Sequence, residues 1–195
     1  LMAVYIAQQY GVGGKVQIRG LGNFTGMLGG VKSGSVDATM ATVSMMNAAL
    51  EEGWGRVLFD VTNAAAWDKV FGGNMTGVCG YVLRDSLESA RNQERIQVLV
   101  NGMVKGTDYL KEHSPEEITN VLYEKFLSGF PRQSVVEGIK VYKSTWNYTN
   151  IVSKEDYDRL IHVMGDGRQY SNSELATYPY EKAVDMSFVK KARGI

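Results

Sequence analysis

The feature that most constrains the fold is a change of hydrophobic pattern partway along the chain. Up to about residue 60, short runs rich in β-branched residues alternate with helix-like stretches. The second half instead follows the period of amphipathic helices almost throughout. An order of strand, helix, strand, helix, strand predicts a parallel sheet with right-handed crossovers. We therefore predict an α/β fold whose first part holds the sheet and whose second part is helical.

The predicted elements of the first part are short and regularly spaced. The strands are Val16–Arg19, Val36–Ala41 and Arg56–Asp60, and the helices between them are Phe24–Lys32 and Met45–Glu52. Thr76–Leu83 then follows as an extended connection out of this first part.

The second part begins with a long amphipathic helix over Glu94–Glu112, which has an apolar stripe at spacings of three and four. Directly after it, Ser114-Pro115-Glu116-Glu117 offers an N-cap, a proline at the first helical position and a glutamate three residues after the cap. This pattern predicts a helix that continues to about Phe126. Further helices are predicted over Ser134–Ser144, Lys154–Met164 and Ser187–Ala192.

Composition excludes several classes of protein. The 195 residues include 21 Lys and Arg against 21 Asp and Glu, so no net positive field favours nucleic acid, which is not an expected partner. Cys79 has no second cysteine to pair with, and with His113 and His162 it does not match zinc-ligand spacing, so neither a metal nor another cofactor is expected.

No membrane span or leader is predicted either. No apolar run approaches the roughly 20 residues that cross a bilayer, and the first residues lack the features of a signal peptide. The chain begins without methionine inside a helix-like pattern, so we expect that upstream sequence is missing.

A glycine-rich turn, Gly20-Leu21-Gly22-Asn23-Phe24-Thr25-Gly26, follows the first predicted strand. Its G-x-G-x-x-x-G spacing departs from the dinucleotide fingerprint. The next strand also lacks an acidic residue at its end, where Thr42, Val43 and Ser44 stand instead. A nucleotide cofactor is therefore not favoured.

The same turn offers free backbone N–H groups at a helix start, beside the Asn23 amide and the Thr25 hydroxyl. Such a start binds an oxyanion without a cationic side chain. The alternative is that Asn23 or Thr25 only caps the helix, and both roles are compatible. Thr42 and Ser44 end the adjacent predicted strand, so the two loops are expected to converge at one edge of the sheet.

No residues nominate a catalyst. His113 falls at a helix end and His162 lies inside a helical pattern, so neither builds a Ser/His/Asp or Cys/His arrangement. Cys79 lies in an apolar run and is interpreted as a buried small hydrophobe. Adjacent acidic pairs fall near predicted helix ends, where dipole pairing or solvation explains them.

Four strings resemble one known family, the substrate-binding proteins of ABC importers in the sulfonate, nitrate, taurine and thiamine-precursor group. The strings, in chain order, are Leu28-Gly29-Gly30-Val31-Lys32-Ser33-Gly34-Ser35-Val36-Asp37-Ala38, Arg56-Val57-Leu58-Phe59-Asp60, Phe71-Gly72-Gly73 through Gly80-Tyr81-Val82-Leu83-Arg84-Asp85, and Val98–Leu122 with its His113-Ser114-Pro115-Glu116-Glu117. Each is common by itself, and their order and spacing over the whole chain carry the resemblance.

The resemblance implies a two-lobed fold of the type II periplasmic-binding-protein kind, with solute held between the lobes. Residues 1–75 would be most of the second lobe, and 76–195 the return crossover with the C-terminal helices of the first lobe. The expected protein is a monomeric, extracytoplasmic and non-catalytic binding component that delivers its solute to a membrane permease. The N-terminal half of the first lobe and the first strand of the second would be absent.

The resemblance also implies a set of ligand-facing positions, all polar or aromatic. They are Asn23, Phe24, Thr25, Thr42, Ser44, Asn74 and Thr76. No arginine or lysine is among them, so an anionic solute would depend on helix starts, hydroxyls or residues now missing. The matching solutes are a sulfonate such as taurine, nitrate, a pyrimidine or an aromatic acid.

Two alternatives remain open from the sequence. One is an enzyme on the same scaffold, such as a pyrimidine synthase of the thiamine pathway, which would need a metal or reactive side chains. The other is a ligand-sensing domain of a regulator, for which a neighbouring DNA-binding helix pair would be the sign; the sequence contains no such pair that we recognise.

Overall fold

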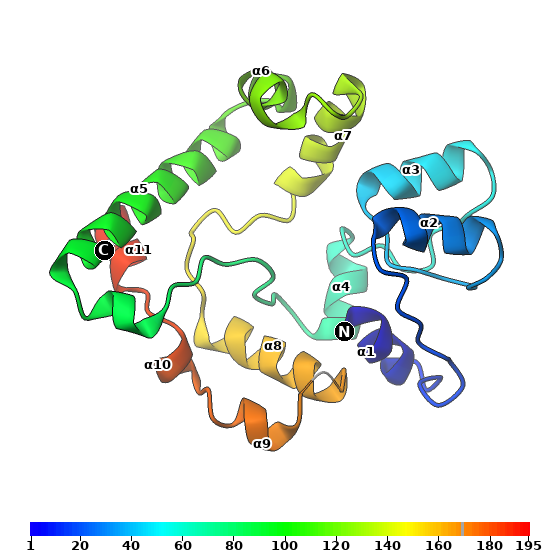
Figure 1. Cartoon of the computed structure of the whole chain (residues 1–195), viewed down its shortest axis with the longest axis horizontal. Helices are drawn as coiled ribbons and strands as arrows, with labels where there is room; N and C mark the ends of the chain where they lie inside the picture. The colour runs from blue at the N-terminus through cyan, green and yellow to red at the C-terminus, as the bar shows by residue number, and fades with distance from the viewer. Residues whose placement is uncertain (169) are drawn as a thin grey trace. The chain divides into compact units, whose positions relative to one another are not determined.

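The computed structural model describes residues 1–168 and 170–195, and in these ranges it consists of helices joined by irregular segments (Figure 1). Of the side chains in these ranges, those of Phe24 and Ser44 are not described. The chain divides into two compact units. Unit 1 comprises residues 1–73 and 161–172, and unit 2 comprises residues 74–160 and 173–195.

The predicted α/β fold with its parallel sheet is wrong, because the described residues are 58% helical and form no strand. Val16–Arg19, Val36–Ala41 and Arg56–Asp60 all lie in irregular backbone without ladder hydrogen bonds. A strand exists only where a neighbour takes up its N–H and C=O groups. The apolar side chains of these segments are also turned partly to solvent, Leu58 by 69%, so no shared sheet face buries them.

Unit 1 contains four complete helices in the described residues: α1 (Met2–Gln9), α2 (Phe24–Lys32), α3 (Val43–Glu51) and α4 (Ala64–Phe71). The predicted bounds of α2 are confirmed, and α3 begins two residues earlier than expected. The prediction missed α4, although Asn63 accepts a hydrogen bond from the Ala66 amide at 3.0 Å as its N-cap and Gly72 ends it with a φ of +75°.

The core of unit 1 is a cluster of aromatic rings around Phe71, which is 3% exposed. The Phe71 ring stacks on Tyr5 at 5.4 Å between centroids and lies 4.4 Å from Trp67. Phe59 meets it edge-on at 6.2 Å. Burial, followed by the charge of Asp166, raises the pKa of Tyr5. Rings at these separations bury large apolar areas and add favourable edge-to-face and stacked contacts.

Unit 2 is built from helices of very different length. They are the 3-10 helix Arg84–Leu87, α5 (Ala90–Glu112), α6 (Pro115–Leu122), the π-helix Tyr123–Leu127, α7 (Arg132–Lys143), α10 (Tyr180–Ala183) and α11 (Ser187–Arg193). Two further helices, α8 (Lys154–Asp166) and α9 (Asn172–Leu175), have residues in both units. The helices predicted from the second half of the sequence are confirmed, within a few residues at each end.

The start of α6 shows why the sequence signal there was reliable. The Ser114 hydroxyl accepts a hydrogen bond from the Glu117 amide at 3.2 Å, and the Glu117 carboxylate accepts one from the Ser114 amide at 2.8 Å. This capping box, with Pro115 at the first helical position, forms from residues adjacent in sequence. It seats Ile118, which is 1% exposed, in the core of unit 2.

Lys143 connects the end of α7 to the end of α5. Its ammonium group donates to the backbone carbonyl of His113 and, at 3.4 Å, to that of Lys111. Carbonyl groups at a helix C-terminus carry partial negative charge and lack partners within the helix, so a cation there is favourable.

Candidate functional site

The glycine-rich turn forms a capped helix start, as one of the two sequence interpretations predicted. The Asn23 side chain accepts a hydrogen bond from the Gly26 amide at 2.8 Å. A side chain at Gly26 would collide with the carbonyl oxygen of Leu21, so glycine is required for the turn to close. Thr25 is exposed beside this cap, and the Phe24 side chain lies outside the described part of the structure.

Thr42 plays the same role at the next helix. Its hydroxyl accepts a hydrogen bond from the Met45 amide at 3.4 Å and caps α3. Ser44 falls in the first turn of α3, and its side chain is not described. The capping interpretation is therefore confirmed at Asn23. Thr42, which was expected at the end of a strand, caps a helix instead, and ligand contact at both positions stays a prediction.

Helices α2 and α3 are tied together at their C-terminal ends. The Lys32 ammonium lies 2.5 Å from the Glu52 carboxylate, which also accepts a hydrogen bond from the Trp54 indole at 2.9 Å. These two hydrogen bonds, that from Lys32 first, lower the pKa of Glu52. Figure 1 shows the two helices running in the same direction, so their capped starts lie at the same end of the pair. The sheet edge at which the two loops were expected to converge does not exist among the described residues, and their convergence stays a prediction.

Asn74 and Thr76 belong to unit 2. The Asn74 carbonyl accepts a hydrogen bond from the Arg159 guanidinium, which is also 2.8 Å from the Glu155 carboxylate. The Thr76 hydroxyl oxygen is buried and has no hydrogen-bond partner among the described residues. A buried hydroxyl without a partner costs free energy and is uncommon in folded proteins. Among the predicted positions whose side chains are described, Thr76 is the one with a buried polar atom in this state.

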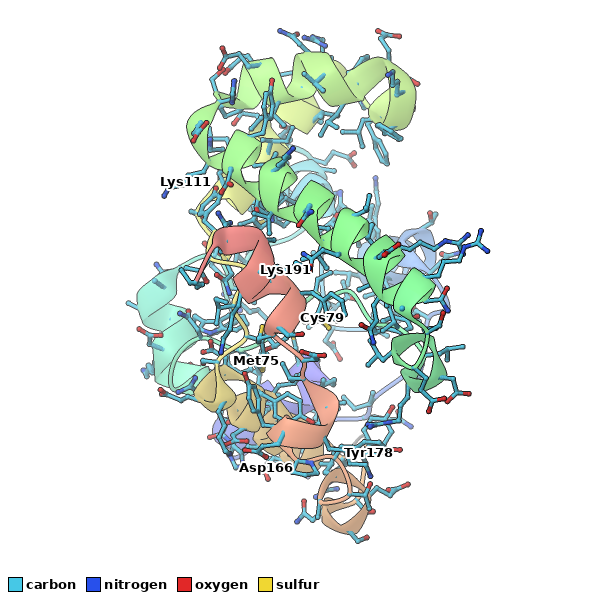
Figure 2. All side chains as sticks on the ribbon, turned by 90° about the vertical axis from the view of Figure 1, so that its left-hand side faces the viewer. Met75, Cys79, Lys111, Asp166, Tyr178 and Lys191 are labelled. Carbon is cyan, nitrogen blue, oxygen red and sulfur yellow. The ribbon has the colours of Figure 1, made fainter. Side chains whose placement is uncertain are left out.

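The two histidines and the cysteine of the chain lie in three different settings. The His113 ring stacks on the Tyr109 ring with 3.7 Å between the centroids, and its Nδ1 lies 2.9 Å from the Tyr109 carbonyl oxygen. His162 is 3.4 Å from the Asp166 carboxylate. Cys79 is exposed in the segment after α4, so the prediction that it is buried is wrong (Figure 2). Among the described residues, no group of three or more histidine, cysteine or acidic side chains is placed to hold a metal.

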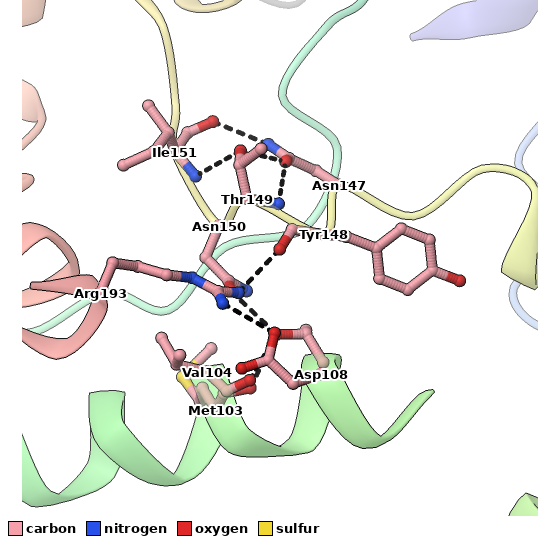
Figure 3. A network of polar contacts seen from close by, with 10 residues as sticks. Met103, Val104, Asp108, Asn147, Tyr148, Thr149, Asn150, Ile151 and Arg193 are labelled. Atoms are coloured by element: carbon pink, nitrogen blue, oxygen red, sulfur yellow. Dashed lines mark hydrogen bonds and ion pairs between the residues drawn. The ribbon is translucent and has the colours of Figure 1, made fainter. Parts of the chain in front are cut away.

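Sequence reasoning missed a polar network centred on Arg193, the last residue of α11 (Figure 3). Its guanidinium donates to the Asp108 carboxylate at 2.7 Å and to the Tyr148 carbonyl at 2.7 Å. It also donates to the Asn150 side chain at 2.5 Å, and the Thr107 hydroxyl donates to the same Asn150 oxygen at 2.9 Å. The sequence showed only that the C-terminal helix ends in basic residues, because the three partners of Arg193 lie 43 to 85 residues away.

No helix in the described part of the chain is both long and apolar enough to cross a membrane. Comparisons with known protein families, curated proteins and solved structures find no match to this chain. The resemblance of its four strings to importer substrate-binding proteins therefore rests on the sequence.

Proposed function

We propose that this chain binds a small solute without transforming it and delivers it to a membrane permease, as the substrate-binding component of an ABC-type importer. The observation that carries the proposal is the ordered set of four family-like strings spread over residues 28–122. The type II periplasmic-binding-protein fold that the resemblance implied is not the fold of the described residues, which form no sheet, so the proposal rests on the sequence strings and not on the fold. The proposed role places the protein outside the cytoplasm, where importer binding proteins work.

The local geometry of the fourth string supports the proposal. That string implies a long helix followed at once by a capped helix start, and the chain has α5 followed by the capping box of α6. This support is limited to local structure, since a capping box is a general helix signal.

Two places in the chain are suited to a small polar solute. The capped starts of α2 and α3 present partial positive charge together with the exposed hydroxyl of Thr25. Separately, Thr76 has a buried hydroxyl that gains a hydrogen bond when a polar group binds beside it. Neither place has a cationic side chain among the predicted positions, which favours a small sulfonate, nitrate or a neutral heterocycle over a multiply charged anion.

The first test is native mass spectrometry of the purified protein against its mass after denaturation. A stoichiometric additional mass that disappears on denaturation is the expected result, and it identifies the solute class. Titration calorimetry with taurine, nitrate and an alkanesulfonate then measures affinity for each probe. No additional mass and no heat with any probe would contradict the proposal, and steady conversion of a pyrimidine precursor in the presence of metal would favour the enzyme.

Thr76→Val tests the position most directly, because valine has nearly the same shape without the hydroxyl. We expect the affinity for the bound solute to fall about tenfold or more, while stability stays equal or rises slightly, since an unpaired buried hydroxyl is removed. Thr119→Val is the matched control. Thr119 is fully buried and its hydroxyl donates to the Pro115 carbonyl at 2.7 Å, so this variant should lose about 1 kcal/mol of stability and keep its affinity.

The helix starts are tested by combining Thr25→Ala with Thr42→Ala. Solute binding should be lost, but loss of the Thr42 cap also weakens α3. Asn63→Ala separates the two effects, because it removes the cap of α4 in the same unit and touches neither helix start. If the double variant binds as well as the parent, the ligand does not contact these starts.

A further inference from the structure

The C-terminal segment of unit 2, Tyr180–Arg193, is attached to the rest of the unit in an unusual way. Its helices α10 and α11 have no buried residue, although α11 packs along α5 (Figure 2). Isolated helices of four and seven residues are not stable in water. The segment therefore owes its position to the contacts that its side chains and backbone make with neighbouring elements.

Besides the packing of α11 on α5, the segment makes polar contacts and one ring contact. The Arg84 guanidinium of the 3-10 helix donates to the Lys182 carbonyl at 2.9 Å, and the Tyr180 ring meets Tyr157 edge-on at 5.8 Å between centroids. The Tyr180 hydroxyl donates to the Val152 carbonyl at 2.7 Å, and the Val152 amide lies 3.4 Å from the Met186 sulfur. On the other side, the Gln97 side chain of α5 donates to the Phe188 carbonyl at 3.0 Å. The segment is thus hydrogen-bonded to α5, to the loop of residues 147–152 and to the 3-10 helix Arg84–Leu87.

Arg193 joins the segment to α5 and to the loop at a single point. One end of its guanidinium bonds Asp108 of α5, and the other bonds the Tyr148 carbonyl and the Asn150 side chain of the loop (Figure 3). Asn150 has a φ of +59°, a backbone conformation that asparagine tolerates better than most residues. The loop is held in this conformation from two sides, because Thr107 of α5 donates to the same Asn150 oxygen.

Attachment of this kind opens at lower free energy than a packed core. Hydrogen bonds of a charged group stabilise more than neutral ones, but such a pair, with Arg193 and Asp108 21% and 40% exposed, stabilises less than a fully buried apolar core. The neighbouring helix α6, by contrast, is seated by Ile118 at 1% exposure. Regions with few buried apolar contacts are the ones that open locally while the rest of a protein stays folded.

We propose that Tyr180–Arg193 is a releasable strap that opens together with the loop of residues 147–152, and that Arg193 is the clasp that keeps both closed. Opening frees the side of α5 against which α11 packs. Since the clasp includes an ion pair, the strap opens more readily as ionic strength rises.

Hydrogen exchange followed by mass spectrometry tests the strap in the full chain. Arg193→Gln should speed amide exchange in residues 187–193 and 148–152 together, by about tenfold to a hundredfold, because bonds to a charged group are lost. Amides of α6 and of unit 1 should be unchanged. Lys191→Gln is the control, since it removes the same charge from an exposed position on the same helix.

Arg193→Lys sharpens the test, because lysine keeps the charge but cannot bridge three acceptors in a planar fork. The amide exchange rates of Arg193→Lys in residues 187–193 and 148–152 should fall between those of the parent and those of Arg193→Gln. Faster exchange confined to residues 187–193 would mean that the loop is held independently, and this would overturn the proposal. Equal acceleration throughout α5 and α6, or none in Arg193→Gln, would overturn it as well.

Discussion

The aromatic core of unit 1 and the C-terminal strap of unit 2 hold distant parts of the chain together by opposite means. In unit 1, Phe71 is in contact with Tyr5, Phe59 and Trp67, and burial of these side chains stabilises the arrangement. In the strap, Arg193 bonds three separate groups while its helix buries no residue. Because of this difference, substitutions in the aromatic core and substitutions in the polar contacts of the strap should have different consequences. Loss of a buried ring destabilises a whole cooperative unit, whereas loss of a polar clasp changes local opening.

Phe71→Ala should have the largest effect, because it removes the ring that the other three contact. We expect a loss of about 3 to 5 kcal/mol in the free energy of unfolding, as for other buried phenylalanines. Chemical denaturation followed by far-ultraviolet circular dichroism measures it, since the described residues are 58% helical. Leu58→Ala, at a side chain 69% exposed, is the control and should change little. Equal losses of stability in the two variants would mean that burial of the Phe71 ring is not what stabilises unit 1.

Ser114→Ala should have an intermediate effect in unit 2. The variant removes the hydroxyl that accepts from the Glu117 amide at 3.2 Å and leaves the rest of α6 unchanged. Loss of such a cap costs about 1 kcal/mol. Circular dichroism during urea denaturation measures the change, and Ser114→Asp should restore most of it because aspartate also caps helices. A loss of stability as large as that of Phe71→Ala would show that polar contacts contribute more to the stability of unit 2 than its buried residues do.

Glu117 predicts a pH dependence of smaller size. The hydrogen bond from the Ser114 backbone amide, and then that involving the Ser114 side chain, lower the pKa of Glu117 below its usual 4.5. A carboxyl with a lowered pKa in the folded state stabilises the fold above its unfolded pKa, and this contribution is lost as the pH falls through the folded pKa. Glu117→Gln should therefore be less stable than the parent at neutral pH, and the two should become alike in acid. A gap that is constant with pH would contradict this assignment.

The sequence predicted local structure well and long-range structure poorly, for a physical reason. The start of α6 and the bounds of α2 depend on residues within a few positions of one another, such as Ser114 with Glu117. A strand depends on a partner elsewhere, so the pattern of Val16–Arg19 alone did not specify a sheet. The candidate site shows the same limit. Asn23 was readable as a cap, whereas the unpaired hydroxyl of Thr76 is a property of its surroundings that no spacing reveals.

Thr25→Ala should have the smallest effect on stability, and it separates positions that hold the fold from positions available to a ligand. Thr25 is exposed in the first turn of α2, and the cap of that helix is made by Asn23. We expect the free energy of unfolding to change by less than about 0.5 kcal/mol, while Asn23→Ala loses about 1 kcal/mol with its cap. Chemical denaturation of both variants measures the change in stability. Titration calorimetry, with the solute found by native mass spectrometry, measures the change in affinity. If Thr25→Ala destabilises the chain as much as Asn23→Ala, its hydroxyl serves the helix start, and any loss of binding would then reflect structure and not contact.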